Sequence, residues 1–296
     1  MTSDEHAERF TALRPLLFTI AYEILGTATE SDDVLQESYL RWAEVDLSAV
    51  YDTKAYLARL VTRQSLNALR AAARRREEYV GPWLPEPLLL EEQDASADVL
   101  LAESVSMAML VVLETLGPDE RAVFVLREVF GFEYDEIASA VGKSTAAVRQ
   151  VAHRAREHVH ARRRRFEPVD PKQSMEVTAR FFAAAATGDM EQLMTMLSPD
   201  VVWTADSDGK ASAARRPIVG SGKVAKLVMG LIRLAGSDGR AEPAVYNNAP
   251  ALVLYLGDHL EGVISIEVID GRITNFYAMR NPEKLATVTV PRQISR

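Results

Sequence analysis

The chain contains no cysteine among its 296 residues, which excludes disulfides, thiolate nucleophiles and cysteine metal sites. This absence fits a reducing compartment, and we expect a cytoplasmic protein. The first ten residues carry charges where a signal peptide needs an apolar core. No run of about 18 apolar residues exists, so no membrane span is expected. Metal-ligand spacing, a phosphate-binding glycine loop and internal repeats are also missing, and we therefore expect no metal and no cofactor.

Acidic side chains are almost missing from two stretches, although the net charge of the whole chain is −8. The segment 54–76 holds seven basic residues and no acid. The segment 143–165 holds eight arginines and lysines, opposed only by Glu157. Basic blocks in an acidic protein are typical of local binding sites for a polyanion. The pattern therefore indicates a nucleic-acid binder with two points of contact.

Hydrophobic periodicity divides the chain into three parts. Helices are predicted over 5–76, with Ser31 as the N-cap of one and Asp52 or Thr53 as the N-cap of the next. An acidic, proline-rich linker follows at 77–102, and further helices at 103–165. The remainder, 166–296, combines helices with short strands and a hairpin signal at Asp270-Gly271. The expected fold is thus two all-α domains, 1–76 and 103–165, and an α+β domain at 166–296.

The sharpest motif lies at 134–158, where two predicted helices are joined by a tight turn at Gly142. In a helix-turn-helix, the second helix lies in the major groove of DNA. The side chains on and near that helix suit phosphates and base edges; they are Lys143, Ser144, Thr145, Arg149, Gln150, His153 and Arg154. A helical hairpin with a solvated basic face is the alternative. The scarcity of acids favours DNA binding.

Several segments resemble a known family. The stretches "DDVLQESYLRW" and "AYLARLVTRQSLNALR" are similar to region 2 of extracytoplasmic-function (ECF) sigma factors, and residues 103–160 resemble region 4. The motifs "YVGPWLPEP", "DSDGK" (206–210) and "NPEKL" (281–285) resemble the SigJ-like group, ECF41. In that group a SnoaL-like domain with the NTF2-like cone fold follows region 4. The chain departs from the common pattern at Arg63 and Asn67, where many members carry Asn and Asp.

The resemblance implies a sigma factor that directs RNA polymerase core to promoter DNA and that is not an enzyme. Its region 2 would be a helical bundle and its region 4 the helix-turn-helix that reads the −35 element. The polymerase contacts would be the beta-prime clamp and the beta flap, with Asp33, Gln36 and Glu37 facing the enzyme. The residues near the −10 strand would be Tyr51, Arg59, Arg63, Asn67 and Arg70.

The resemblance also implies that the fused domain regulates the sigma regions, which would make a separate anti-sigma factor unnecessary. The inter-domain regulatory residues would be Trp83, Leu84, Pro85, Asp206, Asp208, Lys210, Asn281, Pro282 and Lys284. Two alternatives stay open for this domain: a sensor that holds a small apolar ligand, and a cyclase-like enzyme. The enzyme would draw on Asp206, Asp208, Glu267 or His259 as acid or base.

Two acids and one tryptophan in these motifs occupy positions that need a structural explanation. Asp206 and Asp208 fall in a glycine-containing loop, where acids are usually turn formers. Trp83 lies between Pro82 and Pro85 in a stiff linker, where a large apolar ring is unusual. We expect Trp83 to anchor the linker on the C-terminal domain or its junction; the alternative is that it covers the end of the basic helix.

Overall fold

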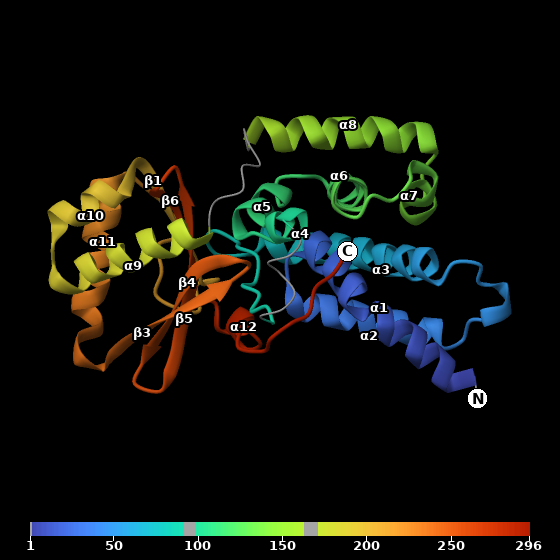
Figure 1. Cartoon of the computed structure of the whole chain (residues 1–296), viewed down its shortest axis with the longest axis horizontal. Coiled ribbons are helices and arrows are strands. Elements are labelled where there is room, and N and C mark those ends of the chain that lie inside the picture. Colours follow the sequence, from blue (N-terminus) through green and yellow to red (C-terminus); the bar gives the residue numbers. More distant parts are fainter. Residues whose placement is uncertain (1, 92–98, 163–170) are drawn as a thin grey trace.

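A computed structural model describes residues 2–91, 99–162 and 171–296 (Figure 1). Residues 92–98 of the predicted linker and residues 163–170, where the predicted α+β domain begins, lie outside the described residues. The helices are α1 (Thr2–Leu25), α2 (Ala28–Trp42), η1 (Leu47–Ala49), α3 (Thr53–Glu77), α4 (Val99–Ser104), α5 (Met107–Leu113), α6 (Pro118–Phe124), η2 (Val125–Val129), α7 (Tyr134–Val141), α8 (Thr145–Arg162), α9 (Pro171–Thr187), α10 (Met190–Met196), α11 (Ser221–Ala235), η3 (Gly236–Asp238) and α12 (Pro282–Leu285). The strands are β1 (Leu197–Asp206), β2 (Ile218–Val219), β3 (Gly239–Tyr246), β4 (Ala249–Leu256), β5 (His259–Ile269) and β6 (Arg272–Met279).

The first helical domain is a bundle of α1, α2 and α3. Asp52 caps α3 as predicted, because its carboxylate accepts from the amide of Ala55 at 2.9 Å. The prediction that Ser31 caps α2 is wrong. The helix begins at Ala28 with Thr27 as its N-cap residue, and the Ser31 hydroxyl donates back to the Thr27 carbonyl inside the helix.

The second helical domain consists of α4 to α8. Its first described helix, α4, begins at Val99. The predicted helix-turn-helix is confirmed: α7 ends at Gly142, whose left-handed φ of 71° favours glycine, and α8 follows directly. Ser144 caps α8 by accepting from the amide of Ala147 at 3.3 Å.

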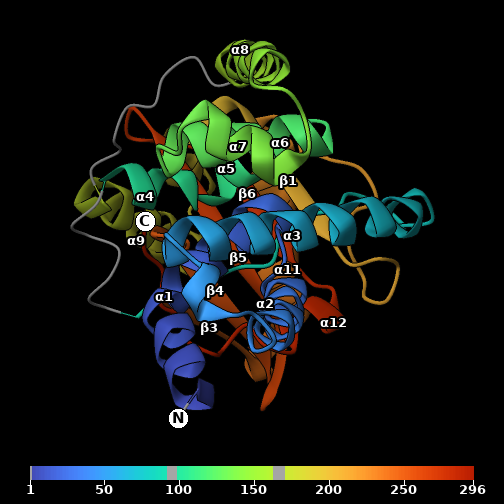
Figure 2. The same cartoon turned by 90° about the vertical axis from the view of Figure 1, so that its right-hand side faces the viewer.

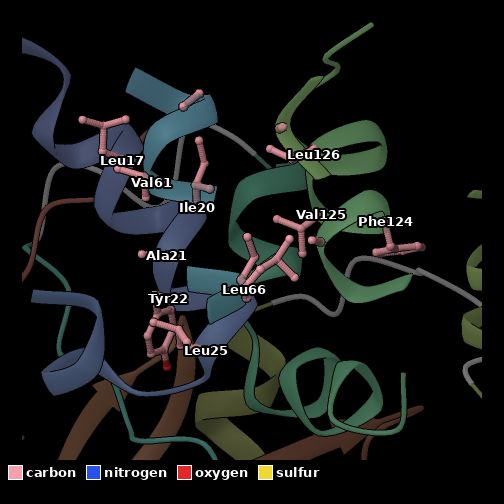
Figure 3. Close-up of a cluster of buried hydrophobic side chains, with 14 of the residues drawn as sticks. Leu17, Ile20, Ala21, Tyr22, Leu25, Val61, Leu66, Phe124, Val125 and Leu126 are labelled. Carbon is pink, nitrogen blue, oxygen red and sulfur yellow. The ribbon is translucent and has the colours of Figure 1, made fainter. Parts of the chain in front are cut away.

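The two helical domains share one hydrophobic core. Figure 3 shows Leu17, Ile20 and Val61 of the first domain in the same cluster as Val125 and Leu126 of the second. Leu66 of α3 lies at the contact between them. The two domains are therefore closed against each other, as Figure 1 also shows for α3 below α6 and α7.

The C-terminal domain is built on a six-stranded sheet of order β2-β1-β6-β5-β4-β3, in which only the β1–β6 pair is parallel within the described chain. Helices α9, α10 and α11 pack on one face (Figure 1). Phe276 lies at the centre of this layer, with ring centroids 5.4 Å from Phe181 and 5.2 Å from Trp203. The predicted hairpin joins β5 and β6 through Asp270 and Gly271, both with positive φ. These elements confirm the expected α+β cone domain.

The other face of the sheet packs on the helical part of the chain. Val253, Val263 and Met279 of the sheet surround Leu84 of the linker and Met107 of α5. The C-terminal segment then returns to the helical domains, where Ile294 is 2% exposed within their shared core. Figure 2 shows the C-terminus beside α1. The C-terminal domain is thus fastened to the helical domains through the linker, the sheet and the tail.

A carboxyl group is buried in the shared helical core. The side chain of Glu23 on α1 is fully buried and accepts a hydrogen bond from the Ser104 hydroxyl at 2.7 Å. Burial raises the pKa of Glu23 to about 8, although Ser104 and Arg121 act in the opposite direction. The folded state therefore holds a proton that the unfolded state releases near pH 4.5.

We predict that Glu23→Gln stabilises the protein, and that the gain depends on pH. Because the folded pKa lies above the unfolded one, the wild-type free energy of unfolding falls as pH rises from about 4.5 to about 8, by up to about 1.4 kcal/mol per pH unit. The melting temperatures of wild type and variant should diverge across this window and run parallel above it. Thermal melts from pH 5 to pH 9 check this, with exposed Glu8→Gln as the control. A constant difference at all pH values would contradict the prediction.

Candidate nucleic-acid interface and inter-domain junction

The predicted −10 residues of α3 face the second helical domain. Arg63 donates to the Ser139 carbonyl at 2.7 Å and to the Ala140 carbonyl at 3.3 Å. Arg59 donates to the Ser139 hydroxyl at 3.3 Å. Ser139 and Ala140 belong to the last turn of α7, whose free carbonyls and helix dipole attract cations. In this structure, therefore, two of the predicted −10 arginines are engaged by the helix-turn-helix.

One carboxylate bridges the two predicted DNA-binding modules. Asp119, at the start of α6, pairs with Arg70 of α3 at 2.8 Å and with Lys143 of the helix-turn-helix at 3.0 Å. Burial alone would raise the pKa of Asp119, but Lys143 and Arg70 outweigh it and hold the pKa below its ordinary value. These are partly exposed pairs, so salt weakens them.

The other predicted DNA contacts are more accessible. Tyr51 is fully exposed on the loop that precedes α3. Asn67 lines an open groove of about 290 Å³ between α3 and the Gly142 turn, together with Arg63 and Arg70. The predicted −35 residues Arg149, Gln150, His153 and Arg154 are exposed on α8. Thr145, at the start of the helix, is half-buried. The predicted −35 face of α8 is thus open to solvent. Most of the predicted −10 residues are exposed as well, but Arg59, Arg63 and Arg70 are bound to the second helical domain.

The predicted polymerase-facing residues lie together on α2. Asp33, Gln36 and Glu37 are all exposed. The neighbouring Asp32 differs, because it pairs with Arg292 of the C-terminal tail at 2.6 Å and with Arg14 at 3.1 Å. Asp32 holds the tail, while the three predicted residues are exposed and only Glu37 among them forms an ion pair within the described residues, with Arg41 at 2.9 Å.

Asp206 is the centre of the inter-domain junction. It ends β1 and is fully buried, so the expectation of a turn-forming acid in a loop is wrong for this residue. Its carboxylate accepts from the Tyr79 hydroxyl at 2.5 Å, the Leu84 amide at 2.7 Å and the Lys284 ammonium at 2.8 Å. Both carboxylate oxygens are therefore engaged in holding the linker.

Lys284 completes this buried arrangement. Its ammonium donates to the Leu84 carbonyl at 2.6 Å as well as to Asp206. Burial lowers the pKa of Lys284, although the Asp206 charge acts in the opposite direction. Asn281 caps α12, with Pro282 at the first helical position, and donates to the Tyr79 hydroxyl at 2.8 Å. The "NPEKL" motif thus forms the short helix that carries the lysine.

The "DSDGK" motif continues the junction toward the surface. Asp208 accepts from the Val80 amide at 3.1 Å and pairs with Lys210 at 2.8 Å. Lys210 also pairs with Glu283 of α12 at 2.8 Å. Unlike Asp206, Asp208 does lie in a turn, with a positive φ of 50°. Pro85 of the linker is buried beside these contacts.

Trp83 lies between two cations from different domains. The Arg76 guanidinium is 4.0 Å from the ring centroid and the Lys284 ammonium is 3.8 Å from it. A Cβ atom at Gly26 would lie 2.9 Å from the ring, at a φ of 76°, so the end of α1 accommodates Trp83 only with glycine. Both interpretations of Trp83 are therefore correct: it covers the end of α3, and it anchors on the C-terminal domain.

Sequence reasoning missed three residues that hold the junction. Glu86 accepts from the amides of Ala28 and Thr29 at 2.8 and 3.1 Å, which fixes the linker on the N-terminus of α2. Asn247 accepts from the Leu88 amide and donates to the Tyr22 hydroxyl. Tyr79 is the third; only their place in "YVGPWLPEP" could have indicated Tyr79 and Glu86. For Asn247 the sequence offers no more than an Asn-Asn turn signal.

Models of two known domains match this chain: Sigma-70 region 2 over residues 9–75 and Sigma-70 region 4 over residues 106–159. These define a sigma factor. ECF RNA polymerase sigma factor SigJ of Mycobacterium tuberculosis is 38% identical over 93% of this chain and 91% of its own length. Probable ECF RNA polymerase sigma factor SigI of the same species is 29% identical over 95% of both chains. The crystal structure of M. tuberculosis SigJ superposes with a TM-score of 0.76 at 33% identity, covering 96% of this chain and 99% of that one. The chain belongs to the ECF RNA polymerase sigma factor family.

We predict that Asp206→Asn releases the linker from the C-terminal domain. The change leaves the buried Lys284 charge without its partner, which costs about 3 kcal/mol. Hydrogen exchange at the Leu84 amide should then accelerate roughly 100-fold, as mass spectrometry of the 79–90 peptide can measure. Asp270→Asn, in an exposed turn of the same domain, is the control. Unchanged protection at Leu84 would show that Asp206 does not hold the linker.

We further predict that Trp83→Ala lowers the free energy of unfolding by about 3 kcal/mol, since a large packed ring and two cation–π contacts are lost. Trp83→Phe keeps an aromatic face between the two cations and should cost about 1 kcal/mol. Urea unfolding followed by circular dichroism compares the two. Equal losses would mean that the cations do not use the ring.

Proposed function

We propose that this chain directs RNA polymerase core to specific promoters and initiates transcription, under control of its C-terminal domain. The observation that carries this proposal is the position of the α3 arginines. Arg59, Arg63 and Arg70, the proposed −10 contacts, bind the Ser139–Ala140 turn and Asp119 of region 4. A sigma factor must present both regions to DNA, so this arrangement is a closed form that has to open before promoter binding.

The proposed partners are polymerase core and promoter DNA. Asp33, Gln36 and Glu37 would contact the beta-prime clamp, and region 4 would contact the beta flap and the −35 groove. Opening would release Arg59, Arg63 and Arg70 from region 4, so that they and Asn67 could bind the −10 strand, where Tyr51 could stack with an unpaired base. The fused domain would replace a separate anti-sigma factor, because the linker that it holds lies between the two sigma regions.

A series of ion pairs and cation–π contacts connects the C-terminal domain with region 4. Glu114, which follows α5, pairs with Arg76 and with the buried Arg121. Arg76 and Lys284 both contact the ring of Trp83. If region 4 departs with Glu114, Arg76 loses its ion pair while the two cations remain on one ring. Departure of region 4 would therefore weaken the docking of the C-terminal domain on the linker. By linkage, docking of the C-terminal domain would stabilise the closed position of region 4.

The enzyme alternative draws little support from the candidate acids. Asp206 is fully buried and both of its carboxylate oxygens are engaged by Tyr79, Leu84 and Lys284, so it is not open to a substrate. Glu267 accepts from Asn275 at 2.7 Å and Tyr277 at 3.2 Å. His259 is exposed at the start of β5. We therefore propose that the domain acts through contacts with the sigma regions. A small apolar ligand remains an alternative input to the same junction.

Run-off transcription with core polymerase tests the main proposal. A library of genomic fragments should give discrete, promoter-specific transcripts that depend on the chain. Loss of these transcripts on Arg63→Ala would accord with the −10 assignment. The absence of any specific transcript with the wild-type chain would refute the proposed function.

We predict that Asp119→Asn shifts the free chain toward an open form. The variant loses two partly exposed ion pairs worth together about 1 kcal/mol, which corresponds to a roughly fivefold larger open population. Because the chain has no cysteine, Glu44→Cys and Glu157→Cys can carry a donor and an acceptor dye without competing thiols. The efficiency of energy transfer between the two dyes should be lower in Asp119→Asn than in the wild-type chain. In the wild-type chain it should fall when salt is added. Asp135→Asn, on an exposed part of α7, should leave it unchanged; identical behaviour of the two variants would contradict the prediction.

A further inference from the structure

A row of basic side chains on the C-terminal domain takes no part in the junction. All are exposed, and none forms an ion pair with another residue in the described ranges. We call these residues the basic row; they are Arg215, Arg216, Lys223, Lys226 and Arg233. Five uncompensated cations are notable in a chain whose net charge is −8.

The spacing along α11 places three of these cations on one face. Lys223, Lys226 and Arg233 lie at positions i, i+3 and i+10, and the helix contains no acid. The three residues span about 15 Å, which matches about four base pairs of a DNA strand. Gly230 lies between them, and a Cβ atom there would meet nothing within 4 Å, so the surface is open to a close partner. The opposite face of α11 is occupied by its buried residues, Val224, Ala225 and Val228.

The first two cations lie next to the end of α3. A Cβ atom on Gly81 would be 3.7 Å from the Arg215 backbone, and one on Gly209 would be 3.4 Å from the Val80 side chain. The loop that carries Arg215 and Arg216 therefore runs beside the linker where it leaves α3, as Figure 2 shows near the C-terminal end of that helix. The buried pair of Asp206 and Lys284 fixes the loop there.

The junction ties the basic row to region 2 through contacts that do not involve region 4. Glu86 binds the N-terminus of α2, and Arg292 pairs with Asp32 on the same helix. When region 4 moves, these contacts keep the basic row in line with the basic face of α3. The row then continues the surface that the proposed function assigns to the −10 element.

We propose that the basic row binds the phosphate backbone of the promoter duplex next to the −10 element, on the side of the C-terminal end of α3. The proposal rests on the proposed function, since it takes promoter DNA as the partner of α3. Lysine and arginine contacts to phosphates release counterions and position a protein without reading sequence. The C-terminal domain would thus add affinity to promoter binding, in addition to its control of the closed form.

The test uses the full chain assembled with core polymerase, on a promoter fragment that the wild-type assembly transcribes. Two double variants remove part of the row: Arg215→Ala with Arg216→Ala, and Lys223→Ala with Lys226→Ala. The matched control, Arg180→Ala with Arg272→Ala, removes the same charge from exposed positions elsewhere on the domain. Each row variant should weaken DNA binding about tenfold near 0.1 M salt and reduce the slope of log K against log salt by about 1.8. The control should change binding less than twofold.

The outcomes separate this proposal from the proposed function. If the wild-type assembly forms but binds no promoter, the proposed function fails. If the wild type binds and both row variants behave like the control, the basic row does not contact DNA and this proposal is overturned. Vesicles with phosphatidylserine serve as a second probe. Binding of vesicles that is lost in the row variants, while their promoter binding stays at wild-type strength, would assign the row to a lipid surface and overturn the proposal.

Discussion

The buried pair of Asp206 and Lys284 is the interaction on which the position of the domains depends. A buried ion pair stabilises a fold only when further hydrogen bonds satisfy its remaining capacity. Here the linker supplies them: the Tyr79 hydroxyl and Leu84 amide satisfy the carboxylate, and the Leu84 carbonyl and Trp83 ring satisfy the ammonium. The pair lacks these hydrogen bonds without the linker, which is also bonded to region 2 through Glu86. The proline-rich segment is therefore a structural part of the C-terminal domain.

The contact between regions 2 and 4 has a different physical character. Its polar part consists of partly exposed pairs such as Arg70 with Asp119, which salt screens. Its apolar part is the shared core, in which Leu66 of α3 meets Val125 and Leu126. The two parts respond to different conditions, since screening weakens the first and leaves the second unchanged. The junction with the C-terminal domain, being buried, should resist salt throughout.

Local signals in the sequence predict local structure well. The cap at Asp52, the turn at Gly142 and the hairpin at Asp270-Gly271 all form as expected, because each depends on a few neighbouring residues. Asp206 shows the opposite case. Its partners Tyr79 and Leu84 lie more than 120 residues away in sequence, so a glycine-containing context indicates a turn where the fold builds a buried ion pair. The periodicity of Arg59, Arg63 and Arg70 identifies a basic face, but only tertiary packing determines that region 4 binds these arginines. The family resemblance identifies the three motifs of the junction, one of which contains Glu86. It identifies neither the contact of Glu86 with α2 nor Asn247, because both roles arise from long-range hydrogen bonds.

The shared core sets a condition on opening. Separating regions 2 and 4 exposes Leu66, Val125 and Leu126, which are all nearly fully buried in the closed form. Each large apolar side chain transferred to water costs roughly 2 kcal/mol, more than the exposed ion pairs contribute. Salt or loss of Asp119 alone can therefore enlarge the open population but not make it dominant. A stable open form needs a partner that covers this apolar surface, and a polymerase that binds region 2 and region 4 at separate sites meets that condition. DNA, whose contacts are largely polar and ionic, is a poor substitute, so we expect polymerase binding to precede promoter recognition.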